Sequence, residues 1–242
     1  MDLRDVYRNI PRRYESTNHL LTFGFDMIWR RIAAGAAARA AEADGNSGTS
    51  VRPSGGDLWL DMCSGTGETA LLLSRRSPAG TTVISADFSV PMLLEGVRRR
   101  GEGTLIPAAA SADALPFPDA TFDLVTITFA ARNLRSRSGL FAGSLREIRR
   151  VLKPRGVFVN LETSQPSAAP VRSILHTYAG TIVGKLGEAL TGEKEGYAYL
   201  SGSIRSFPAP GELAAEIEDA GFSRVTWKKL MFGVAAIHTA IA

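Results

Sequence analysis

The sequence has little cysteine, little histidine and no long apolar run. Its 242 residues contain one cysteine, Cys63, which excludes an internal disulfide and a cysteine-rich metal site, and no metal is expected. Residues 1–5 are charged and no apolar signal segment follows them, and no run reaches the roughly 18 apolar residues that span a bilayer. We therefore expect a cytoplasmic protein, with Cys63 as a small buried residue that has no reactive role.

Charge of one sign is not in large excess either. The 28 lysines and arginines exceed the 24 aspartates and glutamates by four, and most basic residues stand in scattered pairs. Solvated helix faces explain this pattern, so no nucleic-acid partner is expected. The 45% hydrophobic content suits one ordinary domain with a sizeable core.

A strand, a glycine loop and a helix form the most informative stretch. The apolar run 58–60 ends in Asp61, and a loop with Gly65 and Gly67 leads into a helical pattern. Glycine serves where a backbone takes positive φ or lies against a ligand. This order is typical of the ligand-binding corner of doubly wound α/β folds.

A second apolar run, 82–86, ends in Asp87, where such folds place the carboxylate that binds ribose hydroxyls. The dinucleotide pattern places a third glycine where this chain has Ala70, a tolerated change. Asp61 argues more strongly against a dinucleotide, because its carboxylate would repel a pyrophosphate. S-adenosylmethionine carries an ammonium and a sulfonium, so it fits better than NAD.

Strand and helix signals alternate along the middle of the chain, which predicts a parallel sheet covered on both faces. The expected strands are 58–61, 81–86, 104–108, 122–129 and 157–161, and the expected helices are 67–76, 90–99 and 138–152. A helix at 210–220 and an antiparallel hairpin of 223–230 with 233–241 complete the pattern. We predict a Rossmann-like α/β fold of the class I methyltransferase type, with a mostly parallel seven-stranded sheet.

Four regions are expected. Residues 1–56 form an N-terminal helical cap and linker, 57–166 the cofactor-binding core, 167–203 a helical insertion that serves as a substrate lid, and 204–242 the completion of the sheet. Residues 2–43 read as helical and end in the alanine-rich helix 27–43. The mixed segment 14–26 is interpreted as a lid, and a helix packed on the sheet is the alternative.

Several motifs resemble those of one family, the ubiquinone/menaquinone biosynthesis C-methyltransferases of the demethylmenaquinone methyltransferase type. The resemblance runs almost end to end. Its specific parts are Arg132-Asn133 and the stretch Tyr197–Pro208, and its general parts include Tyr14-Glu15-x-x-Asn18, Asp61–Glu68 and Asp87-Phe88-Ser89. Asp26 stands where the family often has histidine, Glu68 where it has aspartate, and Ala130-Ala131 where Gly-Leu is common.

The resemblance implies S-adenosylmethionine as cofactor and a set of residues that bind it. Alignment on Leu115-Pro116-Phe117 places the adenine contact at Ser111, and Asp113 is the alternative. The expected cofactor-binding residues are Asp61, Gly65, Thr66, Gly67, Asp87, Phe88, Ser111, Ala112, Asp113 and Thr128.

The substrate that the resemblance implies is a demethylated polyprenyl quinol, methylated at a ring carbon. The expected catalytic residues are Arg132, Asn133, Tyr14 and His238, and the expected substrate-binding residues are Tyr197, Phe129 and Asn18. Arg132 can stabilise a phenolate, or it can pair with Glu162 and brace the strand ends. His238 can equally be a packed strand histidine, and His19 and His176 are interpreted as surface or packing residues.

The apolar tail of such a substrate implies transient contact with the cytoplasmic face of a membrane. The oligomeric state stays open, with a homodimer as one option. Two other functions also stay open, namely methylation of RNA, protein or another small molecule, and non-catalytic binding of S-adenosylmethionine.

Overall fold

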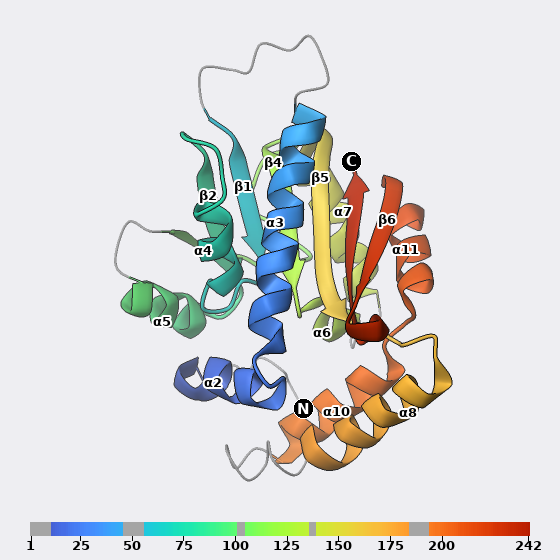
Figure 1. The fold of residues 1–242 in the computed structure, drawn as a ribbon. Helices are drawn as coiled ribbons and strands as arrows, with labels where there is room; N and C mark the ends of the chain where they lie inside the picture. Colours follow the sequence, from blue (N-terminus) through green and yellow to red (C-terminus); the bar gives the residue numbers. More distant parts are fainter. Residues whose placement is uncertain (1–10, 46–55, 101–104, 136–138, 184–193) are drawn as a thin grey trace.

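The computed structural model describes residues 11–45, 56–100, 105–135, 139–183 and 194–242, which include a seven-stranded sheet in the order β3-β2-β1-β4-β5-β7-β6 (Figure 1). Strands β1 to β5 pair in parallel, and β7 pairs antiparallel with β5 and β6. The predicted fold class is confirmed. The strands are β1 Leu58–Met62, β2 Thr82–Asp87, β3 Ile106–Ala109, β4 Phe122–Thr128, β5 Leu152–Thr163, β6 Ser223–Leu230 and β7 Ala235–Ile241.

The described helices follow the predicted order, with the expected interruption after β5. They are α2 Pro11–Leu21, α3 Phe25–Gly45, α4 Glu68–Ser74, α5 Val90–Arg100, α6 Ala131–Arg135, α7 Leu140–Val151, α8 Ala169–Tyr178, α10 Lys194–Ser206 and α11 Pro210–Asp219. A π-helical turn, η1 Ala179–Val183, follows α8, and a 3₁₀ turn, η2 Met231–Gly233, joins β6 to β7. None of the helices in the described part of the chain has the length and apolarity needed to cross a bilayer.

Three features differ from the prediction by more than two residues. The N-terminal helical region breaks at residues 22–24 into α2 and α3. The five-residue α6 was not expected. β5 begins at Leu152, five residues before the predicted strand, because Leu152 pairs with Phe122 and a register shift before the pair Val157–Leu124 accommodates residues 153–156.

Alternating side chains bury both faces of the sheet. Trp59 and Leu124 point to the face that α3 and α4 cover, and Leu60 and Val125 point to the face that α7 and α11 cover. Small residues let α3 lie close against the strands, since its buried positions include Ala33, Ala34, Ala37, Ala38 and Ala41. The alanine-rich helix is therefore the element that packs on the sheet.

Helices α2, α8 and α10 lie across the carboxyl ends of the parallel strands, at the lower end of the molecule in Figure 1. The hydroxyl of Tyr178 on α8 donates a hydrogen bond to the carbonyl of Leu21 on α2. Leu21, Val183, Tyr178 and Leu200 form a small apolar cluster of their own. These helices, which we call the cap, thus have internal contacts separate from the two sheet cores.

Gly96 on α5 offers a test of how closely this helix must approach the glycine loop. A Cβ at Gly96 would lie 2.5 Å from the carbonyl oxygen of Thr66, which is backbone and cannot swing away. Gly96→Ala should destabilise the protein by about 1–3 kcal/mol, measured by urea unfolding. Gly202→Ala on α10, where nothing lies within 4 Å, is the matched control and should stabilise by up to about 1 kcal/mol. Equal effects of the two changes would contradict the close approach.

Candidate functional site

A cavity of about 540 Å³ lies between the carboxyl ends of the strands and the cap. It brings together residues that stand far apart in the sequence, as expected for the end of a parallel sheet. The expected site residues that line it are Asn18, Gly65, Thr66, Asp87, Phe88, Ser111, Ala112, Asp113, Thr128, Phe129, Arg132 and Asn133.

Asp87 and the glycine loop form one wall of the cavity. One carboxylate oxygen of Asp87 accepts a hydrogen bond from the amide of Gly65 at 2.8 Å, and the other accepts from the amide of Ser89 at 2.8 Å. Gly65 and Gly67 take φ of 57° and 79°, the left-handed region that favours glycine. Burial raises the pKa of Asp87, against the effect of these backbone hydrogen bonds. The loop therefore fixes the carboxylate at the end of β2.

Asp61 lies beside the cavity and is not part of its lining. Its side chain is fully buried, and Oδ1 accepts a hydrogen bond from the Thr126 hydroxyl at 2.7 Å. Oδ2 has no hydrogen-bond partner among the described residues, and burial raises the pKa of Asp61 to about 6. An unsatisfied buried carboxylate oxygen next to the glycine loop suits a cationic group on a ligand.

Cys63 was expected to be buried, but it is half-buried and lines the cavity. Burial of the thiol and the nearby charges of Asp87 and Asp61 raise its pKa. The thiol therefore stays protonated near neutral pH, which agrees with the expected lack of a reactive role.

Ser111 and Asp113, the two alternatives for an adenine contact, lie side by side at the cavity. The Ser111 hydroxyl donates a hydrogen bond to Oδ1 of Asp113. The hydrogen bond orients the Asp113 carboxylate, which accepts hydrogen bonds as an adenine amine requires.

Arg132 and Asn133 occupy α6, directly after the end of β4. Arg132 is 8% exposed, and its Nη1 donates to Oε1 of Glu162 at 2.9 Å and to the Thr163 hydroxyl at 3.2 Å. Its backbone amide donates to Oε2 of the same Glu162 at 3.1 Å. The pairing with Glu162 proposed from the sequence is therefore present, and Arg132 also lines the cavity.

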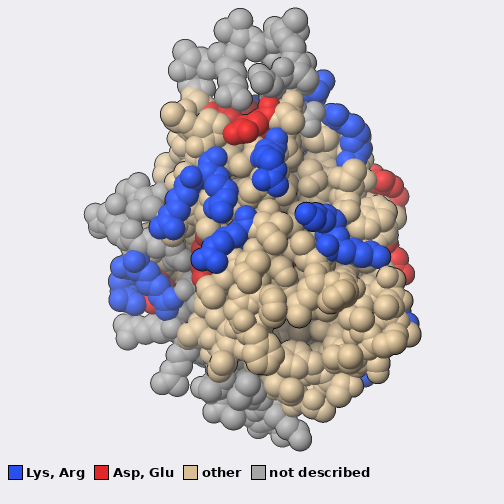
Figure 2. Space-filling model, in the orientation of Figure 1, with Lys and Arg blue, Asp and Glu red and all other residues tan. Residues whose placement is uncertain are grey.

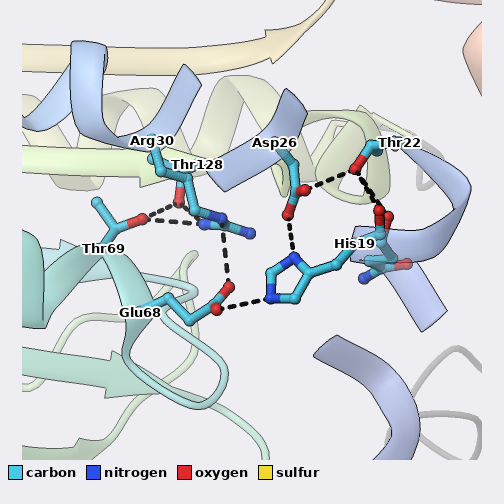
Figure 3. Close-up of polar contacts among 8 residues, drawn as sticks. His19, Thr22, Asp26, Arg30, Glu68, Thr69 and Thr128 are labelled. Carbon is cyan, nitrogen blue, oxygen red and sulfur yellow. Dashed lines mark hydrogen bonds and ion pairs between the residues drawn. The ribbon is translucent and has the colours of Figure 1, made fainter. Parts of the chain in front are cut away.

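His19, interpreted from the sequence as a surface or packing residue, is half-buried between two carboxylates. Its Nδ1 lies 2.7 Å from Oδ2 of Asp26 and its Nε2 lies 3.1 Å from Oε1 of Glu68 (Figure 3). The hydrogen bonds to Asp26 and Glu68 raise the pKa of His19 to about 10, against the effect of burial. The sequence contained one indication of this cluster. Asp26 and Glu68 both depart from the family pattern, and both bind the His19 ring.

His238, Tyr14 and Tyr197 were also expected at the site. His238 is 1% exposed on β7, does not line the cavity, and its Nε2 lies 2.9 Å from the carbonyl oxygen of Pro210. Burial lowers its pKa, so it fits the alternative of a packed strand histidine and we leave it out of the site. The side chains of Tyr14 and Tyr197 lie outside the described residues.

The wall of the cavity opposite the glycine loop is apolar. Val171, Ile174, Leu175, Leu200 and Ile204 from the cap contribute to it. At its rim, Phe23, Ile174 and Phe232 are 74%, 70% and 83% exposed. The cavity thus combines a polar half, suited to a nucleoside with a charged end, and an apolar half that opens to solvent.

Comparison with known proteins identifies relatives along the whole chain. The model of the ubiE/COQ5 methyltransferase family matches residues 1–242. A demethylmenaquinone methyltransferase of Thermus thermophilus is 38% identical, with 96% of this chain and 98% of that protein covered. The ubiquinone/menaquinone biosynthesis C-methyltransferase UbiE of Caulobacter vibrioides is 32% identical, with 98% and 90% covered.

Solved structures share the fold at low sequence identity. A SAM-dependent methyltransferase of Aquifex aeolicus gives a TM-score of 0.52 at 19% identity and covers 77% of this chain and 82% of its own. A putative methyltransferase of Bacillus halodurans gives 0.53 at 15% identity, with 78% and 94% covered. These likenesses support the class I methyltransferase fold.

The His19 cluster predicts a specific dependence of stability on pH. Because the folded-state pKa of His19 is raised from 6.5 to about 10, its contribution is complete below pH 6.5 and is lost as the pH rises to about 10. The difference in melting temperature between wild type and His19→Gln should therefore be largest near pH 6 and vanish near pH 10.

His176→Gln is the control for this comparison, since the His176 ring contacts the amide oxygen of Gln165 at 2.8 Å and no carboxylate of a described residue. A difference between wild type and His19→Gln that stays constant from pH 6 to pH 10 would contradict the charged cluster.

Proposed function

Because the chain belongs to the ubiE/COQ5 methyltransferase family, we propose that it transfers a methyl group from S-adenosylmethionine to a ring carbon of a demethylated polyprenyl quinol. The observation that carries this proposal is the single cavity that joins Asp87 and the glycine loop to an apolar wall and an apolar rim. A nucleoside cofactor fits the polar half, and a ring with a long tail fits the apolar half.

The residues present fit the cofactor. Asp87 can accept the ribose hydroxyls at the end of β2, and Ser111 with Asp113 can receive the adenine. The unsatisfied oxygen of Asp61 supplies negative potential next to the loop. When bound, S-adenosylmethionine supplies an electrophilic methyl group on a sulfonium.

Arg132 has the proposed chemical role. A phenol titrates near pH 10, so at neutral pH the quinol needs help to lose a proton. A buried guanidinium beside the ring oxygen stabilises the phenolate, which pushes electron density onto the neighbouring ring carbon. After that carbon has taken the methyl group from sulfur, it loses its own hydrogen to solvent and the ring oxygen regains a proton. Arginine does not give up its own proton, so a water molecule takes the quinol proton. Glu162 holds the guanidinium in place through the bond at 2.9 Å.

The apolar rim supports contact with a membrane surface. Phe23 and Phe232 take φ of 52° and 56°. This backbone conformation costs a non-glycine residue about 1–3 kcal/mol, and at both positions it holds a highly exposed aromatic side chain. Figure 2 shows most of the basic side chains higher on this face and a hollow lower down that mostly uncharged residues surround. Such a surface can rest on a bilayer, where a polyprenyl quinol resides.

An acceptor assay tests the proposed function. Purified protein is incubated under reducing conditions with methyl-labelled S-adenosylmethionine and, in parallel, demethylmenaquinol, transfer RNA or free amines. The label should enter the quinol. Label in RNA or amine and none in the quinol would support the alternative function and overturn the proposal.

Asp87→Ala tests the cofactor site by calorimetry. Loss of hydrogen bonds to the ribose should weaken S-adenosylmethionine binding by about 1.5–3 kcal/mol. Asp123→Ala, a carboxylate at the opposite end of the sheet that pairs with Lys153, is the control and should leave affinity unchanged. Unchanged affinity of the Asp87 variant would remove this residue from the site.

The variant Arg132→Lys distinguishes a chemical role of Arg132 from a purely structural one. Lysine keeps the charge and loses the planar fork, so the anaerobic single-turnover rate at pH 7 should fall about 10²–10³-fold. The loss should diminish as the pH approaches the pKa of the quinol, because solvent then supplies the phenolate. A lower melting temperature with a nearly wild-type rate at every pH would mean that Arg132 only braces Glu162.

Membrane contact is tested by flotation with anionic vesicles at low salt. Phe23→Ser, Ile174→Ser and Phe232→Ser should each weaken association by about 10- to 100-fold, since burial of one large apolar side chain contributes about 1.5–3 kcal/mol. Leu94→Ser on α5 is the control, because Leu94 is 63% exposed and does not line the cavity. Equal vesicle binding by all four variants, or no vesicle binding by the wild type, would contradict the rim as the contact surface.

A further inference from the structure

Four ionisable side chains gather where the cap meets the glycine loop, and the mechanism above uses none of them. His19 comes from α2, Asp26 and Arg30 come from α3, and Glu68 opens α4 (Figure 3). Thr22 also donates to Asp26, at 2.5 Å. Asp26, Arg30 and Glu68 line the cavity, so the cluster is in reach of a ligand.

Arg30 is held rigidly in this cluster. Its Nη1 donates to the hydroxyl of Thr128 at 2.6 Å and to that of Thr69 at 2.9 Å. Its guanidinium carbon lies 5.0 Å from the centre of the Phe129 ring. These contacts use Nη1 and one face of the guanidinium, and Nη2 makes no hydrogen bond to a described residue.

Glu68 is the obvious partner for Arg30, but His19 competes for it. Nε2 of His19 lies 3.1 Å from Oε1 of Glu68, whereas Nε of Arg30 lies 3.5 Å from Oε2. Nε of Arg30 is buried and makes no hydrogen bond to a described residue. The contact with His19 therefore keeps the Glu68 carboxylate too far from Arg30 to neutralise the charge of the guanidinium fully.

An anionic group on the cofactor would complete the coordination of Arg30. Arg30 and Arg132 are the cationic side chains among the described residues that line the cavity, and Arg132 is bound to Glu162. S-adenosylmethionine carries one carboxylate, next to its ammonium. Arg30 contacts Glu68 and Thr69, which directly follow the loop residues 65–67, and its charge acts on the buried Asp61 that suits the ammonium.

On the basis of the proposed function, we propose that Arg30 binds the carboxylate of the methionine moiety of S-adenosylmethionine. His19 is then a positioning residue, which keeps the Glu68 carboxylate from binding Arg30. A guanidinium matches a carboxylate with two parallel N–H groups. Because His19 belongs to α2, the same contacts tie the cap to the part of the site where the amino-acid end binds.

Two ligands that differ at this end provide the test. S-adenosylhomocysteine has the amino-acid end, and 5′-methylthioadenosine lacks it. By calorimetry, Arg30→Ala should weaken binding of S-adenosylhomocysteine about 10- to 100-fold and leave binding of methylthioadenosine unchanged. Arg30→Gln, which keeps an amide donor for Thr128, serves if the alanine variant does not fold. Arg31→Ala is the control on the same helix, at an exposed position.

A second set of variants tests the positioning role of His19 by ligand affinity. His19→Gln should weaken S-adenosylhomocysteine and spare methylthioadenosine, because Glu68 then closes on Arg30. Adding Glu68→Gln to His19→Gln should restore the affinity, which a purely structural role of His19 would not allow.

Equal weakening of both ligands by the Arg30 variants, or no weakening, would overturn this inference and leave the proposed function standing. A failure of Glu68→Gln to restore affinity would overturn the role of His19. A wild-type protein that binds neither nucleoside would overturn the proposed function and this inference together.

Discussion

The pairing of β1 with β2 on one side and β4 on the other is the constraint on which the rest of the structure depends. The chain passes outward from β1 to β2 and β3, and then returns to place β4 on the opposite side. All five parallel strands consequently end at the same edge, and the connections leave β1 in two directions, which opens a crevice there. Asp87, the glycine loop, Thr128 and Arg132 follow strand ends, so the topology alone brings them to one cavity.

Helices cover both faces of the sheet, and the cap helices α2, α8 and α10 lie across its carboxyl edge. The two halves of the cavity therefore differ in origin. Strand ends and the glycine loop supply fixed backbone groups and carboxylates, and the cap supplies apolar side chains and exposed aromatic residues. The cluster of His19, Asp26, Arg30 and Glu68 joins the two halves, because it pairs charges from α2 and α3 with the first residue of α4.

Much of this arrangement could be predicted from the sequence, where the determinants are local. Asp87 follows an apolar run at the spacing of a βαβ unit, and its carboxylate lies where that spacing predicts. His19 could not be placed in the same way, because its partners are 7 and 49 positions away and depend on how α2 meets α4. His238 required the register of β7, which buries its ring against Pro210. The start of β5 was missed because Pro154 reads as a terminator, while a register shift carries the strand past it.

The central claim is that this cavity forms a carbon–carbon bond on a quinol ring. The position of the transferred methyl group in the product tests that claim most directly. After reaction of a demethylmenaquinol with S-adenosylmethionine that carries a ¹³C-labelled methyl group, NMR of the extracted product determines which atom carries the label. We expect coupling of the labelled carbon to a ring carbon through one bond. A labelled methyl group on a ring oxygen, or a product without the label, would contradict it.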